Sequence, residues 1–319
     1  MVSLLGSRDE LLHVIEKAFD ADIHVRGNEI TITGPAQESE QVAGLFEELT
    51  ELLAGGAELT TDSVERVVAM LRRKSGVRPA DVLSLDILSA RGRTIRPKTL
   101  NQKRYVDAID AHTIVFCIGP AGTGKTYLAM AKAVKALQAK EVNRIILTRP
   151  AVEAGERLGF LPGTLYEKID PYLRPLYDAL HDMIDPESIP RLMAAGTIEV
   201  APLAYMRGRT LNDSFIILDE AQNTSAEQMK MFLTRLGFGS QVVVTGDVTQ
   251  VDLPAGQVSG LRVVQGILDG IEDIHFARLT SHDVVRHRLV GKIVDAYEKY
   301  DAQERQLSSA ARPTRRKGS

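Results

Sequence analysis

The chain has 319 residues, of which 44% are hydrophobic and 25% are charged, and its formal net charge is −3. This length predicts about two domains with a sizeable core, and the apolar runs are far shorter than the ~20 residues that cross a bilayer, so no membrane-spanning protein is expected. A chain with this net charge has no global attraction to nucleic acid, so any such binding must depend on local basic patches.

Residues 1–75 are predicted to form a small α+β domain. Apolar residues recur at helical spacing over residues 11–19, residues 22–33 alternate like two short strands around a turn, and residues 42–53 carry a second helical stripe. This order resembles KH-like RNA-binding units, although the Gly-x-x-Gly backbone clamp of a KH module is absent. An RNA-contacting role and a purely structural or oligomer-contacting role both stay open.

Because no basic secretory start is visible, we expect a cytoplasmic protein.

A further helix, with an apolar stripe over residues 64–71, is expected to end this domain. It is followed by Arg72-Arg73-Lys74, which we interpret as cations at a helix C-terminus, with a nucleic-acid patch as the alternative. Residues 76–98 lose periodicity and contain two prolines, so they predict a linker with a short β-element at residues 86–88.

The second domain is placed at residues 99–302 and begins with a predicted helix. On this helix, Gln102 is a candidate for hydrogen bonds to an adenine edge and Tyr105 for stacking on the ring. An ordinary exposed helix start is the alternative.

Cys117, the only cysteine, lies in the apolar run that follows, which predicts a small buried side chain rather than a reactive thiol.

The strongest motif lies between a predicted strand, residues 114–118, and a run of helix-forming residues at 127–137. The pattern G-x-x-x-x-G-K-[ST] predicts a phosphate-binding loop made of Gly119, Pro120, Ala121, Gly122, Thr123, Gly124, Lys125 and Thr126. Its glycines let backbone N–H groups turn toward phosphate oxygens at a helix N-terminus, which already favours an anion. We expect Lys125 to reach the β- and γ-phosphates of ATP and the Thr126 hydroxyl to ligate Mg²⁺.

Two later apolar runs predict buried parallel strands that end in charged residues. The first ends at Arg149, and the second, residues 214–218, is followed by Asp219 and Glu220. Ligands of open α/β folds bind at the carboxyl ends of their strands. We therefore expect Asp219 to hold Mg²⁺ and Glu220 to orient or deprotonate the attacking water. The long insertion at residues 151–180 is expected to be functional.

A third such strand, residues 241–245, is followed by Asp247 and Gln250, which are expected to sense the γ-phosphate. An ordinary turn is the alternative. Arg286, after the last predicted strand, is a candidate arginine finger or else part of a solvated helix face. Residues 303–319 are rich in Ser, Ala and Arg and predict a basic disordered tail with weak RNA contact.

These motifs together resemble the PhoH-like ATPase family over about residues 80–300. Besides the phosphate loop, the resemblance is carried by Thr148-Arg149-Pro150, Arg207-Gly208-Arg209-Thr210, Asp219-Glu220-Ala221-Gln222-Asn223, Thr245-Gly246-Asp247 with Gln250, and Val285-Arg286-His287. It implies an α/β fold with a RecA-like P-loop parallel sheet flanked by helices, and hydrolysis of ATP with Mg²⁺. Through its relation to the superfamily 1 helicase core, it also implies association with single-stranded or ribosomal RNA. In some members an endoribonuclease partner acts in ribosomal RNA maturation.

Because the stretch after Asp247 is short, we expect it not to form the second RecA-like lobe of a translocating helicase. The arginine that neutralises transition-state charge is then expected from a neighbouring subunit, which predicts a ring-shaped homo-oligomer such as a hexamer. Arg286, Arg207 and Arg209 are the candidates.

Three functions remain after this reading. The leading one is an ATP-hydrolysing, RNA-associated remodeller with helicase-like action. The second is a nucleotide-gated interaction module that controls a partner nuclease without acting on RNA itself. The third is a small-molecule kinase, but the Asp219-Glu220 pair favours activation of water over transfer to an acceptor.

Overall fold

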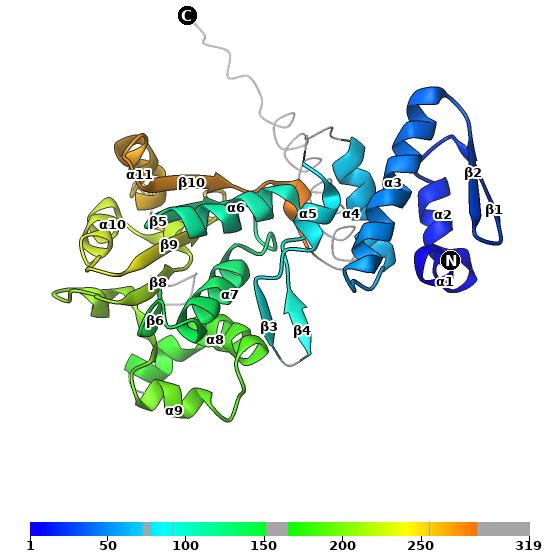
Figure 1. The fold of residues 1–319 in the computed structure, drawn as a ribbon. Helices are drawn as coiled ribbons and strands as arrows, with labels where there is room; N and C mark the ends of the chain where they lie inside the picture. The colour runs from blue at the N-terminus through cyan, green and yellow to red at the C-terminus, as the bar shows by residue number, and fades with distance from the viewer. Residues whose placement is uncertain (73–76, 91, 151–164, 255, 286–319) are drawn as a thin grey trace, which may run out of the picture.

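The computed structural model describes residues 1–72, 77–90, 92–150, 165–254 and 256–285, and only the backbone of residues 165–172. Figure 1 shows a small N-terminal unit, drawn in blue, beside a larger α/β unit that runs from cyan to orange. Within the described part of the chain, no helix is both long and apolar enough to cross a membrane.

The N-terminal unit has the predicted helix–hairpin–helix order. Its elements are α1 (Val2–Leu5), η1 (Ser7–Asp9), α2 (Glu10–Glu16), β1 (Asp22–Arg26), β2 (Glu29–Thr33), α3 (Ala36–Ala54) and α4 (Thr61–Arg72). β1 and β2 pair antiparallel around the tight turn between Arg26 and Glu29. Ile15, Leu49 and Val67, one from each long helix, are fully buried together, because the apolar stripe of each helix faces the same core. The KH-like character of the unit stays a prediction.

The segment predicted as a linker contains secondary structure instead. It holds α5 (Pro79–Leu83), β3 (Leu88–Ala90) and β4 (Arg93–Ile95), and the two strands form an antiparallel hairpin. Ile87, Leu88 and Ile95 are buried in the core of the larger unit, so the segment is fastened to it rather than free. Strands of three residues are too short to show an alternating pattern, which is why the sequence did not indicate both of them.

The larger unit is built on six parallel strands in the order β10-β5-β9-β8-β6-β7. Their bounds are β5 (Ile114–Ile118), β6 (Arg144–Arg149), β7 (Ile198–Pro202), β8 (Ser214–Leu218), β9 (Gln241–Gly246) and β10 (Ile274–Arg278). All residues of β5 and β8 are buried, which explains their continuous apolar sequences. The predicted parallel sheet flanked by helices is confirmed.

Helices cover both faces of this sheet (Figure 1). They are α6 (Leu100–Ala111), α7 (Lys125–Gln138), α8 (Leu165–Met183), α9 (Ile189–Ala194), α10 (Ala226–Leu233) and α11 (Gly260–Leu268), with short 3-10 turns η3 (Leu203–Met206), η4 (Ala221–Asn223) and η5 (Ser281–Asp283). On β5, Val115 and Cys117 face the core that contains α6 and α7, whereas Phe116 faces the core that contains α10 and α11. Alternate side chains of one strand therefore hold the two helical layers to the sheet.

The register of the central strands brings their carboxyl ends to one edge. Ile118 at the end of β5 lies opposite Gly246 of β9, and Leu218 at the end of β8 lies opposite Val244 of β9 and Thr148 of β6. Loops that leave these strands begin side by side, as the position of a ligand site in an open α/β fold requires.

Candidate functional site

The loop between β5 and α7 has the backbone of a phosphate cradle. Gly122 and Gly124 have φ values of 77° and 80°, in the left-handed region that favours glycine. Gly119 is needed for a different reason, since a Cβ there would lie 2.7 Å from the carbonyl oxygen of Leu279. The strand–loop–helix geometry predicted from the sequence is therefore present, with α7 starting at Lys125.

The side chain of Lys125 turns back into this loop. Its Nζ donates hydrogen bonds to the carbonyl oxygens of Gly119 and Pro120, at 2.7 and 2.8 Å. Burial lowers the pKa of Lys125 below its ordinary value, while neighbouring acidic groups act in the opposite direction. The loop thus holds a partly desolvated cation among its own carbonyls, where an anionic phosphate would be a stronger partner.

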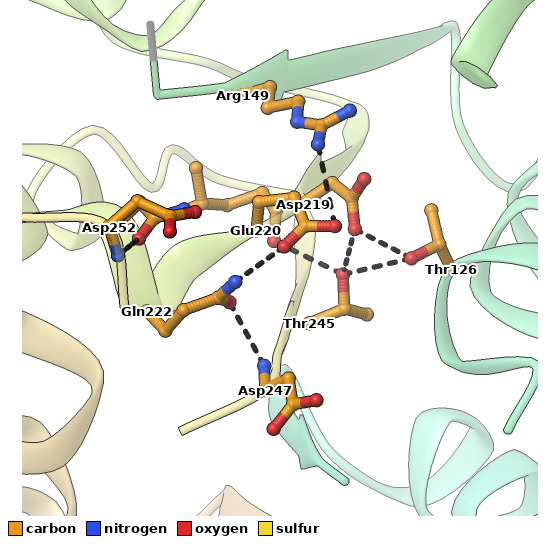
Figure 2. Close-up of polar contacts among 10 residues, drawn as sticks. Thr126, Arg149, Asp219, Glu220, Gln222, Thr245, Asp247 and Asp252 are labelled. Carbon is orange, nitrogen blue, oxygen red and sulfur yellow. Dashed lines mark hydrogen bonds and ion pairs between the residues drawn. The ribbon is translucent and has the colours of Figure 1, made fainter. Parts of the chain in front are cut away.

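The Thr126 hydroxyl meets the carboxylate that follows β8. Thr126 Oγ1 donates to Asp219 Oδ1 at 2.6 Å, and Thr245 Oγ1 at the end of β9 donates to the same oxygen at 2.8 Å, as Figure 2 shows. Asp219 is only 7% exposed. Hydroxyl and carboxylate oxygens are ligands that Mg²⁺ accepts, with phosphate and water completing its shell, so these residues fit a magnesium site.

Glu220 is held from two sides at the same edge. Its Oε1 lies 3.4 Å from Nη2 of Arg149, and its Oε2 accepts a hydrogen bond from Nε2 of Gln222 (Figure 2). The Oε1 of Gln222 in turn accepts from the backbone N–H of Asp247 at 2.9 Å. Gln222 therefore joins the carboxylate after β8 to the backbone after β9.

Asp247 carries an acceptor that the protein does not satisfy. Its Oδ1 accepts from the backbone and the hydroxyl of Thr249, whereas Oδ2 is buried without a hydrogen-bond partner among the described residues. A buried carboxylate oxygen without a partner is costly, so a donor from a ligand or water is expected there. Gln250 is exposed beside it at the rim.

These groups surround one cavity of about 260 Å³. Its lining consists of Ala121, Gly122, Gly124, Lys125, Thr126, Tyr127, Asp219, Glu220, Gly246, Asp247 and Gln250. The structure thus brings together most of the residues singled out in the sequence. Their chemical roles stay predictions.

The two candidates for adenine recognition on α6 lie in the protein interior. Gln102 is 2% exposed; its Nε2 donates to the carbonyl oxygen of Thr123 at 2.9 Å, and its Oε1 accepts from the backbone N–H of Lys98. Tyr105 is fully buried, and its hydroxyl donates to the carbonyl oxygen of Lys125. The prediction that Tyr105 stacks on adenine is wrong, because neither face of its ring is accessible. A contact of Gln102 with adenine stays a prediction.

The candidate arginine fingers differ in their surroundings. Arg209 makes two hydrogen bonds to Glu199, at 2.6 and 2.7 Å, and these raise its pKa. Arg207 is exposed and does not line the cavity of its own chain. Arg286 lies outside the described residues, as do the first part of the predicted insertion, residues 151–164, and the predicted tail.

Thr245 and Gln222 lie in motifs noted in the sequence, but their contacts with Asp219 and Glu220 were not predicted, and neither was the pairing of Arg149 with Glu220. Thr245, Gln222 and Arg149 lie at or shortly after the ends of strands, which was the available signal. Which strand ends are neighbours depends on the strand order β9-β8-β6, and periodicity does not give that order.

Comparisons with known proteins show to which family the chain belongs. A family model described as PhoH-like protein matches residues 94–298. A PhoH-like protein of Mycobacterium bovis is 69% identical over 312 residues, covering 98% of this chain and 89% of that protein. A PhoH-like protein of Bacillus subtilis is 52% identical over 300 residues, covering 93% of this chain and 94% of that protein.

Among solved structures, the Sulfolobus solfataricus SWI2/SNF2 ATPase core in complex with dsDNA is similar over 56% of this chain and 43% of that one. The sequence identity is 15% and the TM-score is 0.34. A likeness of this size says nothing about activity.

Proposed function

The chain belongs to the PhoH-like protein family, and from that premise we propose that it binds ATP with Mg²⁺ at the carboxyl edge of its sheet and hydrolyses the γ-phosphate. The observation that carries the proposal is the contact of Thr126 with Asp219 at 2.6 Å, directly beside the glycine loop. This hydroxyl at the start of α7 and this carboxylate after β8 meet although β9 lies between β5 and β8 in the sheet, and an ordinary strand-to-helix turn does not require such a contact. Together they suit a metal-bound triphosphate.

The polar residues beside the loop then have separate roles. The backbone N–H groups of the loop and the Lys125 ammonium bind the phosphates. Phosphate oxygens then replace the carbonyl oxygens of Gly119 and Pro120 as the hydrogen-bond acceptors of the ammonium. Thr126 and Asp219 would hold Mg²⁺, which supplies neutralisation of phosphate charge when bound. Glu220 orients a water and accepts its proton, and Arg149 and Gln222 keep its carboxylate in place for that step.

The proposal extends to what the ATPase drives. We place single-stranded or ribosomal RNA as the substrate on which turnover acts, with an endoribonuclease as a partner in the cell. Support comes from the resemblance of the family to helicase cores and from the additional α+β unit at the N-terminus. We also propose that chains assemble into a ring, so that an arginine of one subunit reaches the cavity of the next.

The runner-up is a nucleotide-gated interaction module. The chain of contacts from Glu220 through Gln222 to the backbone of Asp247 favours it, because this link can carry the state of the γ-phosphate to the surface loop after β9. In that case ATP turnover controls a partner protein and does not respond to RNA.

The test is titration calorimetry with ATP in the presence and absence of Mg²⁺, followed by phosphate release with and without single-stranded RNA. Magnesium-dependent binding and release without any added acceptor are expected. RNA should raise the rate, and a rate indifferent to RNA would favour the runner-up. A folded chain with no magnesium-dependent affinity for adenine nucleotides would overturn the proposed function.

A further inference from the structure

A second cavity, of about 270 Å³, lies where the N-terminal unit meets the larger unit. Ala69 and Met70 of α4 form one wall, Leu100, Asn101 and Arg104 of α6 form another, and Asp283 of η5 forms a third. Figure 1 shows α4 and α5 beside the orange end of the described chain, past β10. The three walls come from segments far apart in sequence.

Two of these walls are bonded to the phosphate loop itself. The backbone N–H of Val285, two residues after η5, donates to the carbonyl oxygen of Gly122 at 2.9 Å. On the α6 side, Gln102 donates to the carbonyl oxygen of Thr123 at 2.9 Å. The segments that form two walls of the second cavity are therefore bonded to the loop that lines the phosphate cavity.

Hydrogen bonds of the buried Asp283 hold the start of α6 to η5. Asp283 is 1% exposed and accepts hydrogen bonds from Thr99 Oγ1 at 2.6 Å, from Asn101 Nδ2 at 3.0 Å and from the backbone N–H of Thr280 at 2.7 Å. These bonds lower the pKa of Asp283 despite its burial. Because the amide nitrogen of Asn101 is fixed in this way, its oxygen is the acceptor left for a ligand.

The lining has the chemistry of a nucleoside site. Leu100 and Met70 supply apolar surface, Arg104 supplies an exposed planar guanidinium that can stack on an aromatic face, and Asn101 supplies an amide oxygen that can accept from an exocyclic amine.

We propose that the cavity between α4, α6 and η5 receives the adenosine part of the nucleotide, so that helix α4 of the N-terminal unit forms part of the ATP site. This inference rests on the proposed function. If so, the bound nucleotide contacts the N-terminal unit directly, and the position of this unit depends on whether nucleotide is bound.

The first test is Ala69→Trp, which places an indole in the cavity without touching the phosphate loop. Affinity for Mg²⁺-ATP should fall about ten-fold or more, whereas affinity for inorganic tripolyphosphate, which has no base, should be unchanged. The matched control is Ala43→Trp, at an exposed alanine of α3 that does not line the cavity. Retained tripolyphosphate binding also shows that the variant is folded.

The outcomes separate the two claims. If the wild-type chain binds neither ATP nor tripolyphosphate, the proposed function fails. If the wild-type chain binds ATP and Ala69→Trp binds it as tightly as Ala43→Trp does, the inference fails alone.

Photolabelling of the wild-type chain with 8-azido-ATP tests the same point without a variant. The label should attach to peptides from α4 or the start of α6, and excess ATP should prevent it. Label found only on peptides outside both helices would overturn the inference.

Discussion

Glu220 has a strained backbone conformation, and its side chain is held by contacts with Arg149 and Gln222. Its φ of 52° lies in the left-handed region, which costs a non-glycine residue of order 1–3 kcal/mol and is most often found at functional sites. This left-handed conformation turns the chain after Asp219, so that the two consecutive carboxylates make different contacts. Asp219 meets the loop hydroxyl of Thr126, and Glu220 stands between Arg149 and Gln222.

Glu220→Gln tests the role of this carboxylate. The amide keeps the size of the side chain but cannot accept a proton, so turnover should fall by about 10²- to 10⁴-fold while ATP still binds. Phosphate release and calorimetry measure the two quantities. Glu141→Gln, at an exposed site beyond the C-terminal end of α7, is the control. A wild-type rate in Glu220→Gln would remove Glu220 from the reaction.

Gly246 tests the link through Gln222. A Cβ at this position would lie 2.5 Å from Leu261 Cδ2 and 2.8 Å from Gln222 Oε1, so Gly246→Ala should displace the amide that joins Glu220 to Asp247. We expect a loss of about 1–3 kcal/mol of stability together with slower turnover. Thermal unfolding and phosphate release measure both.

The matched control for that variant lies on α11. Gly266→Ala meets no atom within 4 Å and should raise the free energy of unfolding by about 0.5–1 kcal/mol with turnover unchanged. If Gly246→Ala behaved like Gly266→Ala, the link through Gln222 would not matter for activity.

The helices and strands were predictable from sequence to the extent that their burial follows a simple period. β5 and β8 are buried on both faces, and their apolar runs identified them. The three-residue strands β3 and β4 and the short helix α5 have too few positions to show a period. Tyr105 was misjudged because the tyrosine lies on the inner face of α6, where its hydroxyl has a backbone partner.

Periodicity also limits how much of the site could be predicted from the sequence. Each carboxylate at a strand end was visible, since an apolar run led directly into it. The contacts of Thr245 with Asp219 and of Arg149 with Glu220 were not, because they depend on β8 lying between β9 and β6. Crossover connections separate these neighbouring strands by long stretches of sequence.

Burial of β5 has a consequence for stability against pH. Desolvation raises the pKa of the Cys117 thiol above its ordinary value of about 9. The unfolded thiol loses its proton near pH 9 and the folded one does not, so the contribution of this residue is complete below that pH and falls as pH rises above it. The expected slope is at most about 1.4 kcal/mol per pH unit.

Cys117→Ala removes this dependence. Urea unfolding of wild type and variant, measured at neutral and alkaline pH, should show the wild type losing stability relative to the variant only in the alkaline range. A constant difference between the two across that range would mean that the thiol is not buried as the structure shows. Since Cys117 is the only cysteine, no other thiol contributes.

At the scale of the whole molecule, the cavity at the edge of the sheet is lined by acids and a lysine, and no arginine of the described residues lines it. Arg149 is engaged with Glu220, and Arg209 is engaged with Glu199. Arg207 is exposed after η3 and does not line the cavity of its own chain. Among the described residues, it is therefore the candidate for reaching the cavity of a neighbouring subunit. Such an arginine is worth about 10³–10⁵ in rate when it acts in trans.

Mixing two inactive variants tests action in trans. Arg207→Ala lacks the proposed finger and Glu220→Gln lacks the proposed base, so each alone should hydrolyse ATP slowly. In a mixed assembly, some interfaces join an intact Glu220 from one chain with an intact Arg207 from the next, and turnover should reappear as the two are combined. Arg26→Ala, at an exposed arginine of the N-terminal unit, serves as the control and should keep its rate. If the mixture stayed as slow as its components, or if dilution to a monomer left the wild-type rate unchanged, each cavity would complete its own chemistry and the ring would have no catalytic purpose.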